Sequence, residues 1–600
     1  MSQKQIPPTP DPAKLAENWN TIAERSRRLL EDFAKKQAAG ELPNTDPNEF
    51  AVITRPLQTF IERVSRDPTQ LMSAQFGLWQ DSITLWQRMG QKMMGGQVDP
   101  VIEPAPGDKR FKDDAWIENP VFDFIMQSYL LAAKYTTAAL PTQDHGSTDS
   151  KKKSQQLEFY TKQFIDAMSP SNFAATNPAV LRETVNSGGE NLVNGLKNLL
   201  DDLGADGQLR VKMTALDEFE VGKNVGTTPG KVVFETPLIQ LIQYTPTTET
   251  VYKRPLLIIP PWINKFYILD LQPKNSFIKY AVDQGHTVFV ISWVNPDEAL
   301  TDKSFDDYLL EGSLAALDAI EKATGERDVN LVGYCLGGTL TACTVAYLEA
   351  RNDKRVKSAT YFASLVDFSE PGDLGVFIDE EHLDLVDRQM KKKGYLDGST
   401  MATAFNALRA NDLIWSFVVN NYLMGKEPFP FDLLFWNSDA TRMPRVMHNF
   451  YLREMYLENR LREPGGISLN QTPLDLRAVK APTYIVSTKD DHIAPWRSTY
   501  AATQLYSGQV RFVLGGSGHI AGIINPPSAK KYGHWIGTEL GPDPDEWLAN
   551  ATAHDGSWWN DWRAWVRKYA GKKVPARVPG DAELAIIEDA PGRYVQVRAA

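Results

Sequence analysis

The chain is short of cysteine, with only Cys335 and Cys343 in 600 residues. Both lie in one predicted helix, so about 12 Å separates their Cα atoms at a rise of about 1.5 Å per residue. A disulfide needs Cα atoms closer than about 7 Å, so the two thiols cannot bond to each other. We expect Cys343 to pack in the core as a small apolar side chain.

Long apolar runs are also missing. None approaches the about 18 residues that a membrane-spanning helix needs. The start of the chain is polar and rich in proline around residues 6–10, which is not typical of a signal peptide. We therefore expect a cytoplasmic protein without a membrane span.

Positive charge is scarce, because the formal net charge is -11. This balance argues against a nucleic-acid partner. The short lysine runs at residues 151–153 and 391–393 are expected to be solvated loops. No His, Cys and Asp cluster has the spacing of metal ligands, and no Walker-type lysine follows a glycine-rich loop, so neither kind of site is expected.

Two patterns divide the chain. A hydrophobic content of 42% and 15 tryptophans indicate a globular protein, and the length favours two domains. Residues 1–215 predict an all-α N-terminal domain, whose first 107 residues give the weakest signal; Asn119 and Asn177, each followed by proline, are expected to cap helices. Residues 216–600 alternate strands with helices, which predicts an α/β domain with a mostly parallel sheet covered on both faces.

Eight apolar segments carry the strand prediction in the second domain. They are residues 232–235, 239–244, 256–260, 287–292, 329–333, 356–363, 483–487 and 510–514. The alternation is interrupted at about residues 367–443, a segment rich in aromatic side chains. Two interpretations remain open for it: a cap that moves over the active site and excludes water, or a second packed helical layer.

The most informative motif is Gly-Tyr-Cys-Leu-Gly-Gly at residues 333–338, between a predicted strand and a predicted helix at residues 339–350. This context is that of a nucleophile elbow, in which glycines permit the tight turn and close packing. Cys335 then lies at a helix N-terminus, which lowers a thiol pKa from about 8.5. The motif predicts acyl transfer through a thioester, with the backbone N–H of Leu336 as one oxyanion donor.

A catalytic cysteine needs a histidine and an acid. Asp490 and Asp491 follow the strand at 483–487, and His519 follows the strand at 510–514. The order nucleophile, acid, histidine is the one that α/β-hydrolases use. We predict Cys335, Asp491 and His519 as the catalytic residues, with Asp490 as the second choice for the acid. Each residue taken alone could instead be a packing or turn residue.

Beyond these motifs, the chain carries Pro-Pro-Trp-Ile-Asn-Lys at residues 260–265 and Phe-Trp-Asn-Ser-Asp at residues 435–439. With Asp-His-Ile-Ala-Pro-Trp at 491–496 and Ser-Gly-His-Ile-Ala-Gly at 517–522, the chain resembles class I, single-subunit polyhydroxyalkanoate synthases, or poly(3-hydroxybutyrate) polymerases, of the α/β-hydrolase superfamily. The resemblance covers most of the chain from about residue 108 onward.

The resemblance implies that (R)-3-hydroxyacyl-CoA, most simply 3-hydroxybutyryl-CoA, is polymerised into polyhydroxyalkanoate with release of CoA and without a metal or organic cofactor. Cys335 would be acylated and His519 would be the general base with Asp491 as its partner. Either His519 or Asp491 could deprotonate the incoming hydroxyl. By analogy of fold, a second oxyanion donor is expected within residues 262–265.

Four further residues are candidates for the substrate channel: Asn264, Trp436, Asn437 and His492. A simple loop histidine is an equal alternative for His492.

The resemblance also implies partners. These are the growing polyester chain, the surface of the polymer granule, granule-associated proteins and a second copy of the chain, at granules in the cytoplasm. Two other functions compete: a thioesterase or polyester hydrolase of the same fold, and a granule-coat protein with a vestigial site. Cysteine rather than serine at the elbow favours the transferase, and the intact acid and histidine count against the coat protein.

Two aromatic patterns lie outside the predicted site. Met72, Phe76, Trp79, Ile83 and Trp86 step by four and three residues, as one face of a helix does. We prefer the interior of a helical bundle for this stripe over a surface that coats a granule or binds a partner. The tryptophans between residues 547 and 565 are expected to pack a helix against the core.

Overall fold

A computed structural model of the chain describes residues 68–140, 148–204 and 209–598, together with several residues between 17 and 27. The chain forms two compact units. Unit 1 comprises Met1–Ala215 and Phe405–Phe429, and unit 2 comprises Leu216–Ala404 and Pro430–Ala600. Each unit is described by itself.

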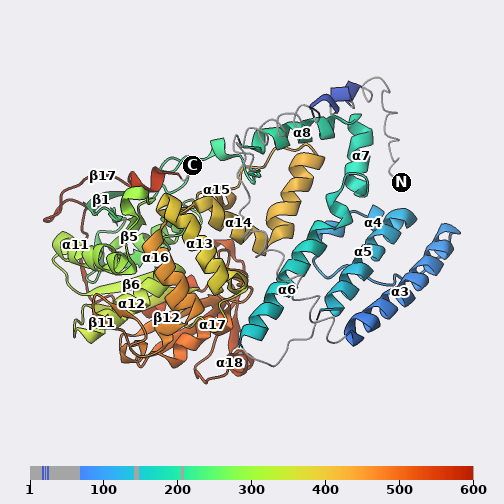
Figure 1. Ribbon diagram of the computed structural model, residues 1–600. Coiled ribbons are helices and arrows are strands. Elements are labelled where there is room, and N and C mark those ends of the chain that lie inside the picture. The colour runs from blue at the N-terminus through green and yellow to red at the C-terminus, as the bar shows by residue number, and fades with distance from the viewer. Residues whose placement is uncertain are drawn as a thin grey trace. The chain divides into compact units, whose positions relative to one another are not determined.

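Unit 1 is helical (Figure 1). Its main helices are α3 (Thr69–Met93), α4 (Ala115–Glu118), α5 (Pro120–Ala138), α6 (Thr148–Ala167), α7 (Pro178–Ser187) and α8 (Glu190–Asp202). The predicted caps are confirmed, because Asn119 and Asn177 each accept hydrogen bonds from two amides of the first turn, with proline next in the chain. The early lysine run is not a loop, since residues 151–153 lie within α6.

Residues 405–429 join this unit, although they lie far along the sequence. They include the π-helix η9 (Val418–Leu423), which packs on α8. The Tyr422 hydroxyl donates to Asp202 at 2.7 Å, and the Asn191 amide donates to the Leu423 carbonyl at 2.8 Å. A Cβ at Gly195 would lie 1.8 Å from the Tyr422 carbonyl oxygen, so only glycine fits there. This stretch falls inside the segment 367–443 that interrupts the strand-helix alternation.

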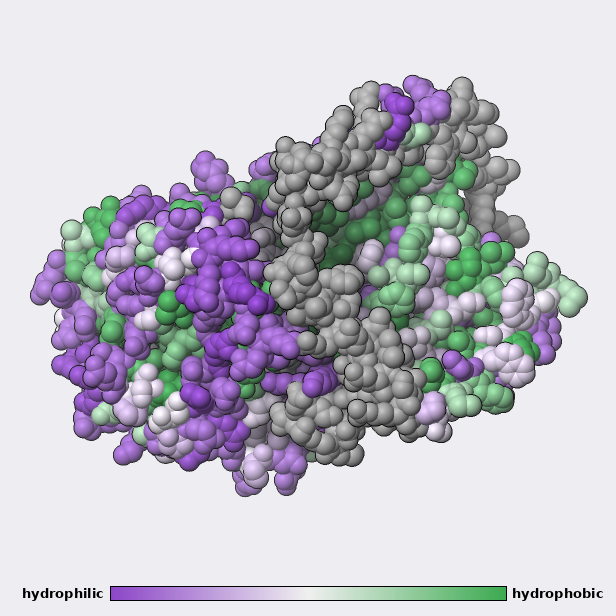
Figure 2. All heavy atoms as spheres, in the orientation of Figure 1, coloured by the Kyte–Doolittle hydropathy of each residue, from purple (hydrophilic) through white to green (hydrophobic). Residues whose placement is uncertain are grey.

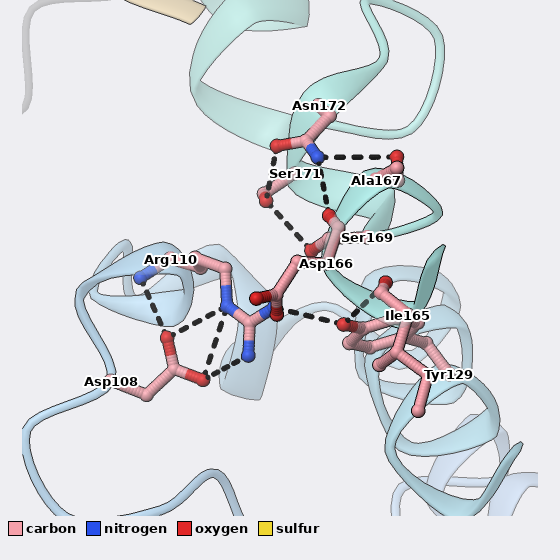
Figure 3. A network of polar contacts seen from close by, with 9 residues as sticks. All are labelled: Asp108, Arg110, Tyr129, Ile165, Asp166, Ala167, Ser169, Ser171 and Asn172. Carbon is pink, nitrogen blue, oxygen red and sulfur yellow. Dashed lines mark hydrogen bonds and ion pairs between the residues drawn. The ribbon is translucent and has the colours of Figure 1, made fainter. Parts of the chain in front are cut away.

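A polar network around Arg110 connects three parts of unit 1 (Figure 3). Its guanidinium contacts Asp108 at 2.8 Å, Asp166 at 3.2 Å and the Tyr129 hydroxyl at 2.8 Å. Tyr129 in turn donates to the Ile165 carbonyl at 3.0 Å. Burial opposes the charge of Arg110, but the hydrogen bonds and the two carboxylates outweigh it and raise the pKa. The network therefore fixes the segment before α4 against α5 and the end of α6.

The aromatic stripe of α3 corrects the preferred prediction. Met72, Phe76, Trp79 and Trp86 are 61–65% exposed and Ile83 is 39% exposed, so the stripe does not face a bundle interior. The buried positions of α3 are instead Ala74 and Leu85, and Gly77 lies against the ring of Tyr135. The helix packs through Leu85 and through the small residues Ala74 and Gly77, and the side chains of the aromatic stripe stay largely exposed. Figure 2 shows green and pale atoms over this helix, at the right of the view.

Unit 2 is built on an 11-stranded sheet with the order β15-β14-β13-β12-β7-β6-β4-β5-β2-β1-β17. The strands are β1 (Gly230–Glu235), β2 (Ile239–Tyr244), β4 (Leu256–Ile259), β5 (Val288–Trp293), β6 (Val329–Tyr334), β7 (Val356–Phe362), β12 (Thr483–Thr488), β13 (Val510–Gly515), β14 (His534–Ile536), β15 (Thr552–His554) and β17 (Glu588–Asp589). All eight predicted strands are present, with ends that shift by no more than two residues.

The middle of the sheet is parallel, from β5 through β4, β6, β7 and β12 to β13. Antiparallel pairs extend it on both sides. Every residue of β4, β5, β6 and β12 is buried, which requires cover on both faces. The predicted mostly parallel α/β fold is therefore confirmed.

The helices of unit 2 follow the strands (Figure 1). They are α9 (Phe277–Asp283), α10 (Phe305–Asp307), α11 (Ala315–Thr324), α12 (Leu336–Ala350), α13 (Glu380–Lys393), α15 (Asp432–Ser438), α16 (Arg445–Phe450), α17 (Trp496–Tyr500), α18 (Pro544–Asn550) and α19 (Trp559–Val566), and α14 (Gly398–Leu408) crosses into unit 1. Lysines 391–393 form the last turn of α13 and are not a loop. Their cations offset the negative end of the helix dipole there.

The tryptophans between residues 547 and 565 pack against the core, as predicted. Trp547, Trp558, Trp559, Trp562 and Trp565 are at most 5% exposed. The indoles of Trp558 and Trp559 donate to the carbonyls of Gly522 and Ile523 at 2.8 and 2.9 Å. The start of α19 therefore supports the loop that follows His519.

Among the described residues, no helix is both long and apolar enough to cross a membrane.

One buried histidine, His286, predicts how low pH changes the stability of unit 2. His286 is 1% exposed, lies against the rings of Tyr252 and Trp562, and neither ring nitrogen has a hydrogen-bond partner. Burial lowers its pKa from 6.5 to about 3. The contribution of the neutral His286 to the free energy of unfolding is therefore fully present above pH 6.5. Below this pH the unfolded chain takes up a proton that the folded chain does not bind, and the free energy of unfolding falls by about 1.4 kcal/mol per pH unit.

We expect His286→Phe to remove this share of the acid sensitivity. Urea unfolding followed between pH 7 and pH 4 should show a shallower decline of the unfolding free energy than in the wild type. Tyr252→Phe alters the same aromatic cluster without removing a group that titrates in this range, and should keep the wild-type slope. Equal slopes for His286→Phe and the wild type would contradict the assignment.

Candidate active site

Cys335 lies between the end of β6 and the first turn of α12 (Figure 1). Its backbone has φ 51° and ψ -120°, a conformation that costs a non-glycine residue about 1–3 kcal/mol. The amide of Cys335 donates to the Phe362 carbonyl at 2.9 Å, and its carbonyl accepts from Gly338 at 2.9 Å. The thiol is only half-buried. The turn therefore holds a strained residue with its side chain within reach of a substrate.

The two glycines after Cys335 allow this turn to pack. A Cβ at Gly337 would lie 2.0 Å from the Ile259 carbonyl oxygen, and one at Gly338 would lie 1.8 Å from the Ser364 hydroxyl. Any larger residue would push α12 away from β4 and from the segment after β7. The role that the sequence predicted for these glycines is thus confirmed by their contacts.

Asp491 follows β12 and is fixed on every side. Its Oδ2 lies 2.7 Å from Nδ1 of His519 and accepts from Thr488 at 3.2 Å, while its Oδ1 accepts the amides of Ile493 and Ala494 at 2.9 and 2.8 Å. The carboxylate side chain is 0% exposed. These four contacts fix the carboxylate in one position, from which it orients the imidazole of His519.

His519 lies on the loop after β13 and is 8% exposed. The ring of Tyr334 stacks on its imidazole with centroids 5.6 Å apart, and the Tyr334 hydroxyl donates to the His519 carbonyl at 3.3 Å. Burial lowers the pKa of His519, but Asp491 and the hydrogen-bonded Cys335 outweigh burial and raise it well above 6.5. The site therefore favours an imidazolium between a carboxylate and the sulfur.

The three predicted residues thus meet at one place. They come from the carboxyl ends of β6, β12 and β13, which lie at the same edge of the parallel sheet. Cys343 differs in each respect: it is 0% exposed inside α12, and burial raises its pKa to about 12. Its predicted packing role is confirmed.

Asp490 and Leu336 also have clear positions. Asp490 is exposed, and its amide donates to the Ser517 carbonyl at 3.0 Å, so its backbone joins the two loops that carry Asp491 and His519. Leu336 is the first residue of α12, and the helix itself offers no acceptor for its N–H.

The predicted channel residues are spread over several elements. Trp436 is 4% exposed and its indole donates to the Lys265 carbonyl at 2.8 Å, which favours a supporting role. Asn264 pairs through its backbone with Ala440, Asn437 is half-buried in α15, and the His492 carbonyl accepts from Asp373. Their place in a substrate channel stays a prediction.

Two tyrosines near the sulfur were missed by the sequence reasoning. Tyr451 and Tyr456 lie on the π-helix η10 (Tyr451–Leu457) and are 4% and 7% exposed. They hydrogen-bond to each other, and both are close enough to Cys335 for its charge to raise their pKa values beyond the effect of burial. Nothing in the local sequence marks them, although π-helices often occur at functional sites.

Comparison with known proteins shows the family to which the chain belongs. Residues 107–281 match the family described as the N-terminus of poly-beta-hydroxybutyrate polymerase (PhaC), and residues 254–526 match the alpha/beta hydrolase fold. The chain is 47% identical over its whole length to the whole poly(3-hydroxyalkanoate) polymerase of Methylorubrum extorquens.

Two further relatives are poly(3-hydroxyalkanoate) polymerase subunits PhaC. The protein of Rhizobium meliloti (strain 1021) is 46% identical, covering 98% of this chain and 96% of its own. The protein of Cupriavidus necator is 43% identical, covering 89% of both chains. On this full-length similarity, the chain belongs to the family of poly(3-hydroxyalkanoate) polymerases, which are acyltransferases with an α/β-hydrolase fold.

Proposed function

We propose that the chain polymerises (R)-3-hydroxyacyl-CoA, with 3-hydroxybutyryl as the main unit, through an acyl group carried on Cys335. The observation that supports this most is the hydrogen-bonded series Cys335, His519 and Asp491 at the end of a parallel sheet. The steps proposed below use only groups of the chain and of its substrate.

The cycle begins with transfer of the Cys335 proton to His519. The thiolate attacks the thioester carbonyl, and the bond to the CoA sulfur breaks as His519 returns its proton to the leaving thiolate. Asp491 keeps Nδ1 of His519 protonated, so that Nε2 is the nitrogen that exchanges the proton. One thioester is exchanged for another, and the acyl group stays activated on the enzyme.

The tetrahedral intermediate carries an oxyanion that needs donors. The N–H of Leu336 is the first, at the positive end of α12. A backbone N–H within residues 262–265 is the proposed second donor, because Ile259 and Pro260, just before this segment, lie against Gly337 in the first turn of α12. Loss of one such donor typically slows a reaction about 10²–10³-fold.

In the second half of the cycle a 3-hydroxyl group gives its proton to His519 and attacks the acyl-cysteine. An ester forms as the bond from the acyl carbon to Sγ of Cys335 breaks, and the sulfur leaves as thiolate and takes the proton back from His519. The four contacts of Asp491 occupy both of its oxygens, which supports His519 rather than Asp491 as the acceptor of the hydroxyl proton. Ester formation from a thioester is downhill, whereas a serine ester would lose this drive. Growth competes with hydrolysis, so a dry site is needed, and the buried Tyr451 and Tyr456 beside the sulfur supply apolar walls.

The proposed partners follow from the same chemistry. They are the growing polyester, the granule surface with its associated proteins, and a second copy of the chain, at granules in the cytoplasm. The exposed stripe of α3 suits the granule surface because it presents five large apolar side chains along about 20 Å of helix. Burying one such side chain contributes about 1.5–3 kcal/mol.

We expect brief exposure to labelled (R)-3-hydroxybutyryl-CoA to leave an adduct on Cys335 and none on Cys343, as mass spectrometry of the digested protein can show. Continued incubation should release thiol and deposit insoluble polyester. Cys335→Ala should lose both signals, and Cys335→Ser should retain at most weak hydrolysis. Thiol release without polymer would identify a hydrolase instead, and neither signal would favour a coat protein.

Asp491→Asn should slow CoA release by about 10²–10⁴-fold, because the amide can donate to Nδ1 and favour the wrong histidine tautomer. Asp490→Asn is the matched control one residue away: its side chain is exposed, and its rate should stay within about twofold of the wild type, as surface substitutions usually do. A larger loss in Asp490→Asn than in Asp491→Asn would exchange the two roles.

The double variant Phe76→Ser and Trp79→Ser should weaken binding to purified poly(3-hydroxybutyrate) granules at least about tenfold, since 1.4 kcal/mol corresponds to that factor. Co-sedimentation measures the bound fraction, and light scattering checks the dimer. Phe164→Ser is the control, because Phe164 is 65% exposed in the same unit but lies outside the stripe. An equal loss in the control, or no loss in the double variant, would remove the stripe from the binding surface.

A further inference from the structure

Lys265 is a buried cation that the proposed cycle does not use. It is 2% exposed and lies in the segment between β4 and the short helix η4 (Phe266–Asp270). Burial lowers its pKa to about 8, and the through-space effect of Asp439 only partly opposes this. A buried ammonium is tolerated when hydrogen bonds replace its water.

Those hydrogen bonds come from the other end of the chain. Nζ of Lys265 donates to the carbonyls of Val595 and Val597 at 3.0 and 2.6 Å. Residues 594–598 are called here the C-terminal strap. The amide of Asn295 donates to the same Val597 carbonyl at 3.1 Å, and Val595 is 1% exposed. The strap is therefore a built part of unit 2 rather than a loose end.

The strap is also fastened on both sides of the lysine. The Tyr594 hydroxyl donates to the Thr236 carbonyl at 2.9 Å, and the Tyr594 amide donates to Gln240 at 3.1 Å. Arg598 lies 4.9 Å from the ring centre of Phe435. These contacts make the carbonyls of Val595 and Val597 fixed anchors for the ammonium.

The segment that Lys265 belongs to, residues 260–265, is called here the β4 loop. Thr441 binds it at two points, by donating its hydroxyl to the Trp262 carbonyl at 2.5 Å and its amide to the Ile263 carbonyl at 3.2 Å. Trp436 binds the carbonyl of Lys265 itself. At its start the loop passes the first turn of α12 so closely that residue 337 must be glycine.

We propose that Lys265 is a positioning residue for acyl transfer: by binding the C-terminal strap, it holds the β4 loop where a backbone N–H can face that of Leu336 across the oxyanion. This rests on the proposed function, because it assigns a support to the second oxyanion donor. A displacement of about 1 Å in such a donor is enough to lose about 10²-fold in rate.

The test compares Lys265→Met with Lys265→Arg and with Lys303→Met. Methionine keeps the length and apolar stem of lysine but cannot donate, arginine keeps the charge, and Lys303 is a half-buried lysine of the same unit that pairs with Glu311 at 2.5 Å. The readouts are kcat and KM for CoA release from (R)-3-hydroxybutyryl-CoA, the rate at which iodoacetamide alkylates Cys335, and the melting temperature.

We expect Lys265→Met to lower kcat 10- to 100-fold with KM and the alkylation rate within twofold of the wild type, because the oxyanion exists only in the transition state. Lys265→Arg should recover part of this loss, and Lys303→Met should match the wild type. Asn295→Ala removes the other donor to Val597 and should show the same pattern more weakly, which keeps the test available if Lys265→Met does not fold.

An unchanged kcat in folded Lys265→Met would overturn the proposal, and so would an alkylation rate that falls with kcat, since that would mean general loss of the site. Failure of the proposed function is separate: it would appear as the absence of an acyl adduct on Cys335 of the wild type.

Discussion

The chemistry of this molecule depends on one strained turn. Cys335 occupies a positive φ that an L-residue avoids, and the strain is tolerated because the turn is fixed at both ends by backbone hydrogen bonds and packed through Gly337 and Gly338. Relaxing the turn would move the sulfur away from His519 and would reorient the Leu336 N–H at the start of α12. The positions of the Cys335 sulfur and of the Leu336 N–H are therefore set by a single local constraint, which the surrounding sheet supports.

Electrostatics then decides what the sulfur can do. Asp491 is buried, and its two oxygens are fixed by contacts with two amides, a hydroxyl and His519. The Asp491 carboxylate and the hydrogen bond with Cys335 raise the pKa of His519 against the effect of burial. Cys343, buried on the same helix without such neighbours, has its pKa raised to about 12. The two cysteines therefore differ in burial and in neighbouring groups because of their positions in the fold, although their residue type is the same.

The sequence predicted the sheet well, and it singled out the three side chains that the structure brings together, Cys335, Asp491 and His519, because both leave local signals. Buried parallel strands are continuous apolar runs, and each catalytic residue directly follows one. The apolar stripe of α3 was assigned to the wrong side of the surface because periodicity identifies an apolar face but not whether it is covered; the helix packs instead through Ala74 and Gly77. Lys265 and Tyr456 were invisible for a different reason. The strap that binds Lys265 and the Cys335 that lies near Tyr456 are both distant from them in sequence, and neither local pattern nor composition indicates such contacts.

The same long-range contacts bear on how the chain folds. Unit 1 needs residues 405–429, because Gly195 and Asp202 on α8 have their partner in Tyr422. Unit 2 needs the C-terminal strap, because the ammonium of the buried Lys265 would otherwise lose its hydrogen bonds to the carbonyls of Val595 and Val597. Neither unit can bury its polar groups until a segment made much later joins it, and such non-local closure slows folding. The contacts between Lys265 and the strap span 330 and 332 residues of sequence, so they belong to these non-local closures.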